Sequence, residues 1–421
     1  MMFWSSIKSV ASLLSSYGLL MVANAMFGTL LGLRSKIEGF STEVTGVIMA
    51  GFFIGMLLGA FYAVRIVASA GHIRSFAAFA SIMSVAVLAH VLIIDPVAWF
   101  LLRAITGFCT AGMIMIVESW LNERSTNATR GRVLSLYMIT NYLGAGSGQF
   151  LITVANPDSF QLFSVASIIF SIALVPILLT RATAPKPSAP ERMKFRELVK
   201  ISPVGVAGTL VAGLANSAIN SMGPIFAATI GLSLGQISTF MATILLGGML
   251  LQFPVGRLSD LFDRRTILII SALATALVSG GIIWAAEEHY ILSLFAFCII
   301  YGGFCYTIYP MSSAQVNDLA DQDRLVQVSA GLLLAYGTGA SIGPIVASQI
   351  MGQVGPNGLF YYIIGCTLIL AVLTIIRVIQ RPSGKKKAEF LPLGSLGSSS
   401  KQLYSTVAQE TYDQEKDVND K

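Results

Sequence analysis

Two ionisable side chains lie inside apolar stretches of this sequence, where charge is costly. Arg103 stands several residues inside one such stretch, in the segment LLRAITG that ends at Gly107. Because an unpaired guanidinium in hydrocarbon must reach a partner or water, we expect Arg103 to face a polar cavity. The alternative is that its long stem lets the charge snorkel to the surface, toward Asp95.

Glu118 is the second such residue, and it is the only acid in the same stretch, about one helical turn from its far end. A buried carboxylate either pairs with a base or takes up a proton. Arg74 and Arg130 are candidate partners, whereas a protonated Glu118 would be able to carry a proton. We favour the salt bridge.

Other residue types that carry chemistry are scattered. The cysteines lie in apolar stretches without a C-x-x-C pair, so we expect buried free thiols, no disulfide framework and no metal site. The histidines lie far apart near the ends of these stretches, where a solvated or interfacial role is expected. No phosphate-binding loop and no nucleophile–base–acid set is visible, so we predict neither a cofactor nor enzyme activity. These residues are Cys109, Cys298, Cys305 and Cys366, and His72, His90 and His289.

The composition requires a membrane protein. Of the 421 residues, 55% are hydrophobic and only 11% are charged, whereas soluble domains carry about 25% charged residues. Stretches of about 20 apolar residues can cross a bilayer, and in hydrocarbon they must be helices. We therefore predict an all-α membrane protein with twelve transmembrane helices, at roughly 10–33, 43–67, 75–94, 97–120, 132–155, 160–180, 204–229, 235–256, 266–286, 290–312, 325–350 and 358–379.

Basic residues indicate how these helices are oriented, because cytoplasmic loops are rich in Lys and Arg. With the N- and C-termini both cytoplasmic, all of the 27 basic residues fall on the cytoplasmic side except Arg34, Lys36 and Arg103. The net charge of +6 then reflects topology, and no nucleic acid partner is expected. Residues 381–421 are polar and are expected to form a disordered cytoplasmic tail.

The chain is internally repeated. The segment GMLL begins at 55 and at 248, GFC at 107 and at 303, and G-x-x-x-G at 144 and at 339. Three matches in one order, at an offset of about half the chain, predict two six-helix bundles, residues 1–182 and 204–380. The segment 183–203 between them is rich in proline and charge, and we expect it to be an exposed cytoplasmic linker.

A short charged connection between two apolar spans carries the clearest motif. Residues 256–265 read GRLSDLFDRR, and such charge stays hydrated in a tight cytoplasmic turn. The segment resembles the G-x-x-x-D-(R/K)-x-G-R-(R/K) signature of the major facilitator superfamily of secondary transporters. The matching residues are Gly256, Asp260, Arg264 and Arg265, and the departures are Leu261 and Asp263.

Further segments resemble the YcaD-like bacterial branch of this superfamily. They are VESWL at 117–121, RGRVLSLYM at 130–138, and the run from LLLAY at 332–336 to the Gly343-Pro344 pair. Together with the loop signature they cover both halves of the chain. The resemblance implies a major facilitator fold in the bacterial inner membrane.

The resemblance also implies roles for two sets of residues. A central cavity would be lined by the first, fourth, seventh and tenth helices, whose polar groups could bond a neutral or amphipathic solute or bond helix to helix. A cytoplasmic charge cluster, in which Asp260 and Arg264 reach toward Asp318, would act as a conformational switch that holds the outward-open state. Because Arg103 is the only deep charge in the cavity set, a polyanionic substrate is not expected. The cavity set is Arg103, Asn24, Thr106, Asn216, Asn220, Tyr306 and Tyr309, and the switch set is Gly256, Asp260, Arg264, Arg265, Glu118, Arg74 and Asp318.

Glycines recur every fourth residue in three spans and so share one face of each helix. Small residues at this spacing let helices approach closely in lipid. We expect them where the two halves meet, and both ordinary tight packing and sliding of the halves would use them. One such pattern ends in Gly343-Pro344, whereas Gln149 takes the place of that proline in the fifth span. The glycines are Gly51, Gly55 and Gly59, Gly144 and Gly148, and Gly339 and Gly343.

Two functions from different classes fit these features. The first is a secondary active transporter that moves a small molecule by alternating access, with protons as the expected coupling ion. The second is a transport-inactive membrane sensor or scaffold on the same fold. The near-complete loop motif favours the transporter. We expect it to act as a monomer in the lipid bilayer, with no cofactor.

Overall fold

The computed structural model describes residues 2–125, 127–179, 193, 195–321 and 324–380. The expected tail at 381–421 lies outside the described residues, and so does most of the linker predicted at 183–203. Within the described ranges, long helices make up nearly the whole structure. The helices of the first half are α1 (Met2–Ile37), α2 (Thr42–Ala70), α3 (His72–Leu92), α4 (Pro96–Arg124), α5 (Asn127–Phe150) and α6 (Gln161–Leu178), with a short 3-10 turn, η1 (Leu151–Thr153).

The second half repeats this arrangement after one short linker helix, α7 (Phe195–Ile201). Six spans again follow, and one of them is broken into two helices. These helices are α8 (Pro203–Thr229), α9 (Leu234–Leu261), α10 (Arg264–Glu287), α11 (Ile291–Cys305), α12 (Ile308–Asn317), α13 (Leu325–Val354) and α14 (Gly358–Gln380).

Eleven spans in the described residues are long and apolar enough to cross a membrane. The remaining helix of the twelve expected is α5, which has 24 residues and at 1.5 Å per residue is about 36 Å long. It lies against α1 and α9, and its polar residues Asn141 and Gln149 are buried against the protein. Asn141 accepts a hydrogen bond from Tyr17 and Gln149 accepts one from Thr29, and these contacts with α1 explain why α5 is less apolar than a lipid-facing span.

The break between α11 and α12 was not expected from the sequence. The span predicted at 290–312 ends its first helix at Cys305 and resumes at Ile308. Pro310 has no N–H to donate, and its ring would clash with the carbonyl of Tyr306, four residues earlier. The proline therefore explains a bend at Tyr306 and Thr307.

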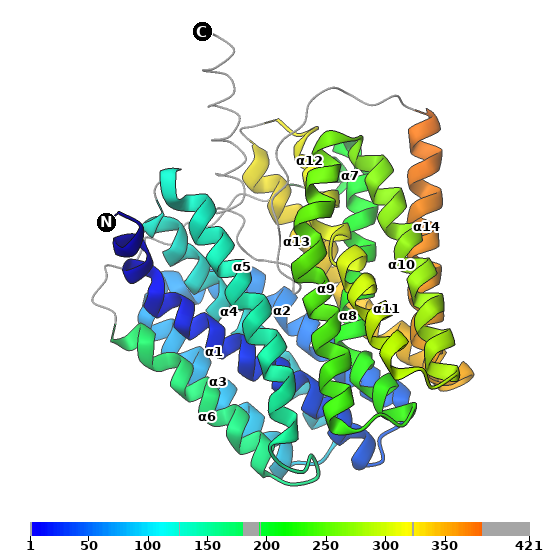
Figure 1. The fold of residues 1–421 in the computed structure, drawn as a ribbon. Coiled ribbons are helices and arrows are strands. Elements are labelled where there is room, and N and C mark those ends of the chain that lie inside the picture. Colours follow the sequence, from blue (N-terminus) through cyan, green and yellow to red (C-terminus); the bar gives the residue numbers. More distant parts are fainter. Residues whose placement is uncertain (1, 126, 180–192, 194, 322–323, 381–421) are drawn as a thin grey trace.

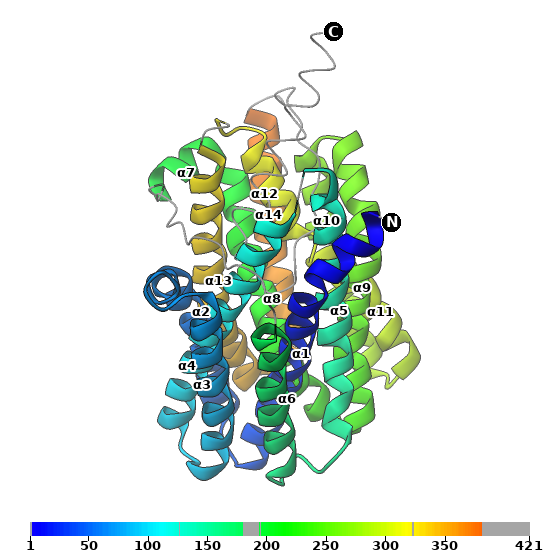
Figure 2. The ribbon, with the colours of Figure 1, turned by 90° about the vertical axis from the view of Figure 1, so that its left-hand side faces the viewer.

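The helices form two groups that lie side by side (Figure 1). We call α1–α6 the N-half and α8–α14 the C-half, and each packs chiefly within itself, with α2 against α4 and α13 against α8. The start of α1 and the end of α14 lie at the end of the molecule that carries α7, here called the α7 end (Figure 1, Figure 2). The two halves diverge toward the α7 end (Figure 1).

The recurring glycines pack helices within each half, so the prediction that they mark where the halves meet is wrong. In the N-half, added Cβ atoms on Gly51, Gly55 and Gly59 would strike α4, and those on Gly144 and Gly148 would strike α1. In the C-half, Cβ atoms on Gly339 and Gly343 would strike α8. The close contact of α1 with α5 in the N-half thus recurs as the contact of α8 with α13 in the C-half, as the sequence repeat implies.

One hydrogen bond between the halves joins Tyr142 on α5 to Gln252 on α9 at 3.0 Å, and further direct contacts lie at the end opposite α7, which carries the α1–α2 turn. Nζ of Lys36 donates a hydrogen bond of 3.1 Å to the hydroxyl of Thr229. A Cβ on Gly46 would collide with the side chain of Ser348, and one on Gly352 with the carboxylate of Glu43. The structure is therefore closed at this end.

The linker helix α7 packs on the C-half. Leu198 is fully buried in an apolar cluster with Val316, Val328 and Leu332. Glu197 accepts a hydrogen bond of 2.8 Å from Arg324 at the start of α13. The described part of the linker is thus held against α12 and α13, which corrects the expectation that the whole linker is exposed.

Candidate functional site: a pocket between the two halves

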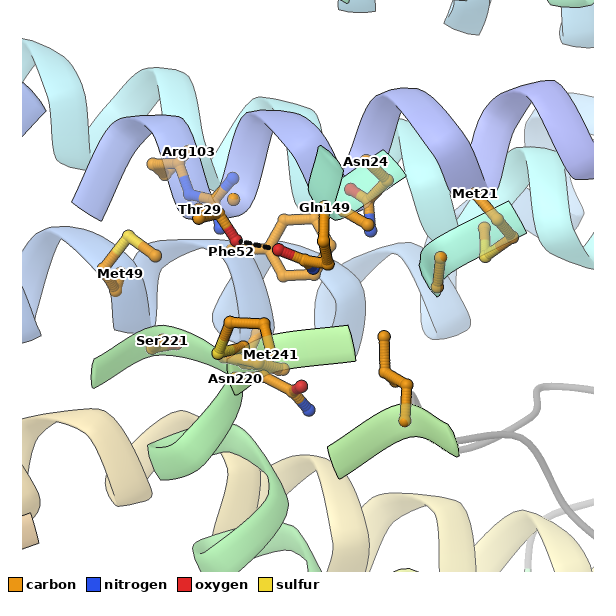
Figure 3. A pocket seen from close by; sticks show the side chains of 15 residues that line it. Met21, Asn24, Thr29, Met49, Phe52, Arg103, Gln149, Asn220, Ser221 and Met241 are labelled. Atoms are coloured by element: carbon orange, nitrogen blue, oxygen red, sulfur yellow. Dashed lines mark hydrogen bonds between the residues drawn. The ribbon is translucent and has the colours of Figure 1, made fainter. Parts of the chain in front are cut away.

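A small pocket lies between the N-half and the C-half (Figure 3). Its open space is about 60 Å³, which is room for a few water molecules or one carboxylate-sized group. The N-half supplies most of the lining, and α8 and α9 close the other side. The lining side chains with polar groups are Asn24, Thr29, Arg103, Gln149, Asn220 and Ser221, and the larger apolar ones are Met21, Met49, Phe52, Phe53, Met241 and Leu245.

Arg103 is the charged residue of the pocket lining, and its side chain is only 3% exposed. Its guanidinium carbon lies 4.5 Å from the ring centroid of Phe52 and 5.6 Å from that of Phe27. Within the described residues, its Nε and Nη1 atoms are buried and have no hydrogen-bond partner. Two aromatic faces stabilise the charge, but the unpaired donors leave it able to bind an anion.

The local sequence explains why Arg103 points inward. Helix α4 starts at Pro96, with the Asp95 carboxylate accepting a hydrogen bond of 2.9 Å from the backbone N–H of Ala98. Asp95 thus caps the helix at the place where the snorkelling alternative needed a partner for Arg103. A Cβ at residue 51 would lie 3.3 Å from the Cβ of Arg103, so Gly51 leaves room for the arginine at the α2–α4 contact.

A hydrogen bond between two helices forms part of the pocket wall. The hydroxyl of Thr29 donates to Oε1 of Gln149 at 2.6 Å, and both side chains line the pocket (Figure 3). From the sequence, Gln149 was notable only because it stands where a proline was expected, and Thr29 was not among the predicted site residues. The available signal was polarity, because Thr29 lies inside the predicted span 10–33 and Gln149 inside the predicted span 132–155.

The expected cavity residues divide into two groups. Arg103, Asn24 and Asn220 line the pocket, and Asn220 accepts a hydrogen bond of 3.1 Å from the hydroxyl of Tyr306. The others lie outside the lining. Thr106 donates to the carbonyl of Arg103 within α4, the thiol of Cys305 on α11 donates to Asn216 on α8, and Tyr309 on α12 packs against Tyr336 on α13.

Glu118 lies in a different environment from Arg103. Its carboxylate is buried and accepts a hydrogen bond of 2.6 Å from the hydroxyl of Tyr137 on α5. Arg74 is exposed at the start of α3, and among the described residues no ion pair joins it to Glu118. The proposed Arg74 partner is therefore wrong, whereas the Arg130 side chain lies outside the described residues.

The charged turn between α9 and α10 holds a compact cluster. Nε of Arg264 lies 2.7 Å from Asp318 on α12 and its Nη2 lies 3.2 Å from Asp260 on α9. Arg265 pairs at 3.1 Å with Asp263, which caps α10. Three helices of the C-half are thereby joined. Gly256 is buried one turn earlier on α9.

His72 and His90 contradict the expectation of solvated or interfacial histidines. His72 is 3% exposed and lies 3.3 Å from the hydroxyl of Ser119, and His90 is fully buried. The expectation failed because both lie near helix ends in the sequence but face neighbouring helices. Only His289, in the turn after α10, is exposed.

Comparison with known proteins identifies the class to which this architecture belongs. The family model for the Major Facilitator Superfamily matches residues 13–207 and 205–408, so the chain belongs to that superfamily. An uncharacterized MFS-type transporter, YcaD, from Escherichia coli strain SMS-3-5 is 26% identical over 370 residues, covering 87% of this chain and 95% of that protein. YcaD of Escherichia fergusonii is similar to the same extent.

Solved structures share the fold at low sequence identity. The nucleoside transporter NupG superimposes with a TM-score of 0.71 at 14% identity, covering 87% of this chain and 98% of that one. A bacterial homolog of the human lysosomal transporter Spinster, in an inward-facing and occupied conformation, gives a TM-score of 0.67 at 14% identity, covering 88% and 96%. The match to the family model and to the YcaD relatives establishes a multi-pass inner-membrane protein of a transporter family, and it indicates a transport protein rather than an enzyme.

Proposed function

We propose that this protein is a secondary active transporter that carries a small neutral or monoanionic molecule through the pocket between its halves. One observation carries the proposal: Arg103 is 3% exposed, lines the pocket, and has two nitrogens without a hydrogen-bond partner in the described structure. A cation held this way is retained where it acts on a solute or a partner. Its positive charge disfavours organic cations.

The two bundles, 1–182 and 204–380, would rock around this pocket to give alternating access. Loops rich in Arg support a cytoplasmic location of the α7 end, with Arg65, Arg257 and Arg324 near that end. The closed end, with Lys36 against Thr229, would then face outward. The structure would be an inward-facing form of the cycle.

The charge cluster of Arg264, Asp260 and Asp318 would stabilise the α7 end of the C-half. The pairs of Arg264 with Asp318 and with Asp260 lie within one half, and they are in place in a form that is closed at the opposite end. The sequence led us to expect that this cluster would hold the outward-open state. The two pairs alone do not mark that state. Instead, they would orient α9, α10 and α12 as one unit that moves during switching.

Protons are the coupling ion that we propose for this transport. Glu118 is one candidate carrier, since its buried carboxylate is bonded to Tyr137 and lies on α4, the helix that also carries Arg103. Protonation of Glu118 would be coupled to the pocket through that helix. A buried carboxylate that loses its hydrogen-bond donor favours the neutral form, because burial disfavours its charge.

Flux in proteoliposomes tests the proposed function. The purified protein is reconstituted with an imposed pH gradient and offered a panel of radiolabelled neutral and monoanionic metabolites. We expect at least one solute to accumulate when the gradient is present and to stop accumulating when a protonophore collapses it. If the Arg103→Ala variant accumulates that solute as fast as the wild type, the pocket is not the transport site. If no solute moves while several bind, the sensor function is correct instead.

A further inference from the structure

A second buried basic group lies close to Arg103. His90, near the end of α3, is fully buried, and its Nδ1 lies 2.7 Å from the carbonyl oxygen of Ala86. A carbonyl only accepts, so Nδ1 carries the hydrogen and the neutral imidazole leaves Nε2 as an acceptor. Within the described part of the chain, Nε2 is buried and has no hydrogen-bond partner.

His90 and Arg103 share one aromatic neighbour. The His90 ring lies 5.2 Å from the centroid of Phe27, edge to face, and the guanidinium carbon of Arg103 lies 5.6 Å from the same centroid. The imidazole and the guanidinium thus lie against the same aromatic ring. Trp99 covers another side of the imidazole at 5.6 Å.

Arg103 is the charged group that dominates the surroundings of His90. The α6 helix contributes no titratable residue between Gln161 and Leu178. On α1, Arg34 pairs with Glu38 at the helix end. On α4, Asp95 is engaged in capping, and Glu118 is 15 residues from Arg103, about 22 Å along the helix. On α2, Glu43 lies against Gly352 in the other half and Arg65 is at the far end of the helix.

We propose that Arg103 and His90 form a site for a monocarboxylate that is bound together with one proton. The carboxylate would contact Arg103, and the proton would enter on Nε2 of His90. This inference rests on the proposed transport function and narrows it to one class of substrate and one proton carrier.

The physical basis is mutual dependence of the two binding events. Burial of His90 already disfavours its charged form, and repulsion from an uncompensated Arg103 adds to this effect, so the imidazole stays neutral. An anion on Arg103 cancels that repulsion and makes protonation of His90 more favourable. By linkage, the protonated histidine strengthens anion binding by the same factor.

The charges balance in each transport step. The carboxylate brings one negative charge and the proton one positive charge, so the loaded site carries the same net charge as the empty one. Release reverses both events, with the proton leaving Nε2 and the carboxylate leaving Arg103. The flexible side chains of Met21, Met49 and Met241 in the pocket wall can rearrange to admit a short apolar chain behind the carboxylate.

Histidine NMR tests the inference directly, because the chain has only 3 histidines. The full-length protein, labelled with carbon-13 at the histidine ε1 position, is placed in lipid nanodiscs, and the His90→Gln variant assigns the His90 signal. The probe is propionate, and propionamide is the neutral control of the same size. We expect propionate to move the titration midpoint of His90 upward by about one pH unit and propionamide to leave it unchanged.

The Arg103→Gln variant gives a second readout that needs no ligand. Removing the positive charge should raise the His90 midpoint in the empty protein and abolish the response to propionate, while His72 and His289 stay unchanged. If neither propionate nor the Arg103→Gln substitution changes the titration midpoint of His90, the inference is wrong. If a solute is transported but the His90 midpoint does not respond to propionate, the proposed function holds and this site is refuted. If the His90 midpoint responds but no solute is transported, the site holds and the transport function is refuted.

Discussion

The hydroxyl of Thr29 on α1 donates a hydrogen bond of 2.6 Å to Gln149 on α5, on the wall of the pocket that Arg103 also lines. The same two helices meet at Gly144 and Gly148, where no Cβ would fit. The close backbone approach therefore brings the two polar side chains within bonding distance. The pocket wall depends on this helix contact as much as on the polar residues themselves.

Replacing Thr29 with valine tests the hydrogen bond in the pocket wall. The change keeps the volume but leaves Oε1 of buried Gln149 without its donor, which costs about 1 kcal/mol. We expect the KM for the transported solute to rise about fivefold, measured as initial flux in proteoliposomes. Thr239→Val on α9 is the control, because Thr239 is only half-buried, lies outside the pocket lining, and donates its hydroxyl to the carbonyl of Gly235 on its own helix. Equal KM values in both variants would show that the bond has no part in the site.

Arg103→Ala is expected to abolish transport while the protein still inserts and folds, since the guanidinium makes aromatic contacts but forms no ion pair with the part of the chain that the structure describes. Arg103→Lys should restore transport only partly, because lysine lacks the planar fork. Arg65→Ala is the matched control, since Arg65 also lies over an aromatic ring, that of Tyr62, but is exposed. Full transport by Arg103→Ala would move the substrate site elsewhere.

The fold was predictable from the sequence because its signals are large. The apolar spans, the repeat offset and the loop signature each depend on many residues or on a rare charge pattern. The bend at Tyr306 was predictable in principle from Pro310, but a span-length criterion joins α11 and α12 into one helix. The polarity of α5 is also explained only by its buried neighbours.

The glycine contacts show a limit of pattern reasoning. Spacing places Gly51, Gly55 and Gly59 on one face of α2, but it does not say which helix that face meets. The partner is α4 in the same half. The four-residue pattern occurs at any close contact of two helices, so it does not distinguish contacts within a half from contacts between the halves. The prediction that His90 is solvated or interfacial was wrong for a similar reason, because the burial of a side chain on α3 depends on how α3 is rotated against α1 and α4.

Glycine substitutions measure the packing inside one half. A Cβ at Gly55 would strike the carbonyl of Ala104, whereas one at Gly146 would meet nothing within 4 Å. We expect Gly55→Ala to destabilise the protein by about 1–3 kcal/mol and Gly146→Ala to be neutral or slightly stabilising. The readout is the thermal midpoint Tm in detergent. Equal Tm values would mean that α2 and α4 separate easily.

The cluster at Arg264 predicts unequal effects of two neutral replacements. Arg264 is 2% exposed, Asp318 7% and Asp260 33%, as side chains. Asp318→Asn removes the buried partner and should cost about 3 kcal/mol, whereas Asp260→Asn should cost under about 1 kcal/mol. Tm values in detergent give the comparison. A larger loss for Asp260→Asn would show that the partly exposed pair, not the buried one, holds α9, α10 and α12 together.

Access to Ser221 from the two sides of the membrane tests the central claim most directly. Ser221 lines the pocket on α8 and is 2% exposed, so Ser221→Cys in a background lacking Cys109, Cys298, Cys305 and Cys366 reports on the pocket alone. A membrane-impermeant thiol reagent is applied to sealed vesicles of each orientation, with and without the solute identified by flux. Alternating access predicts labelling from both sides and a clear change in both rates when the solute is present. Labelling from one side only, at a rate that the solute does not change, would contradict the account.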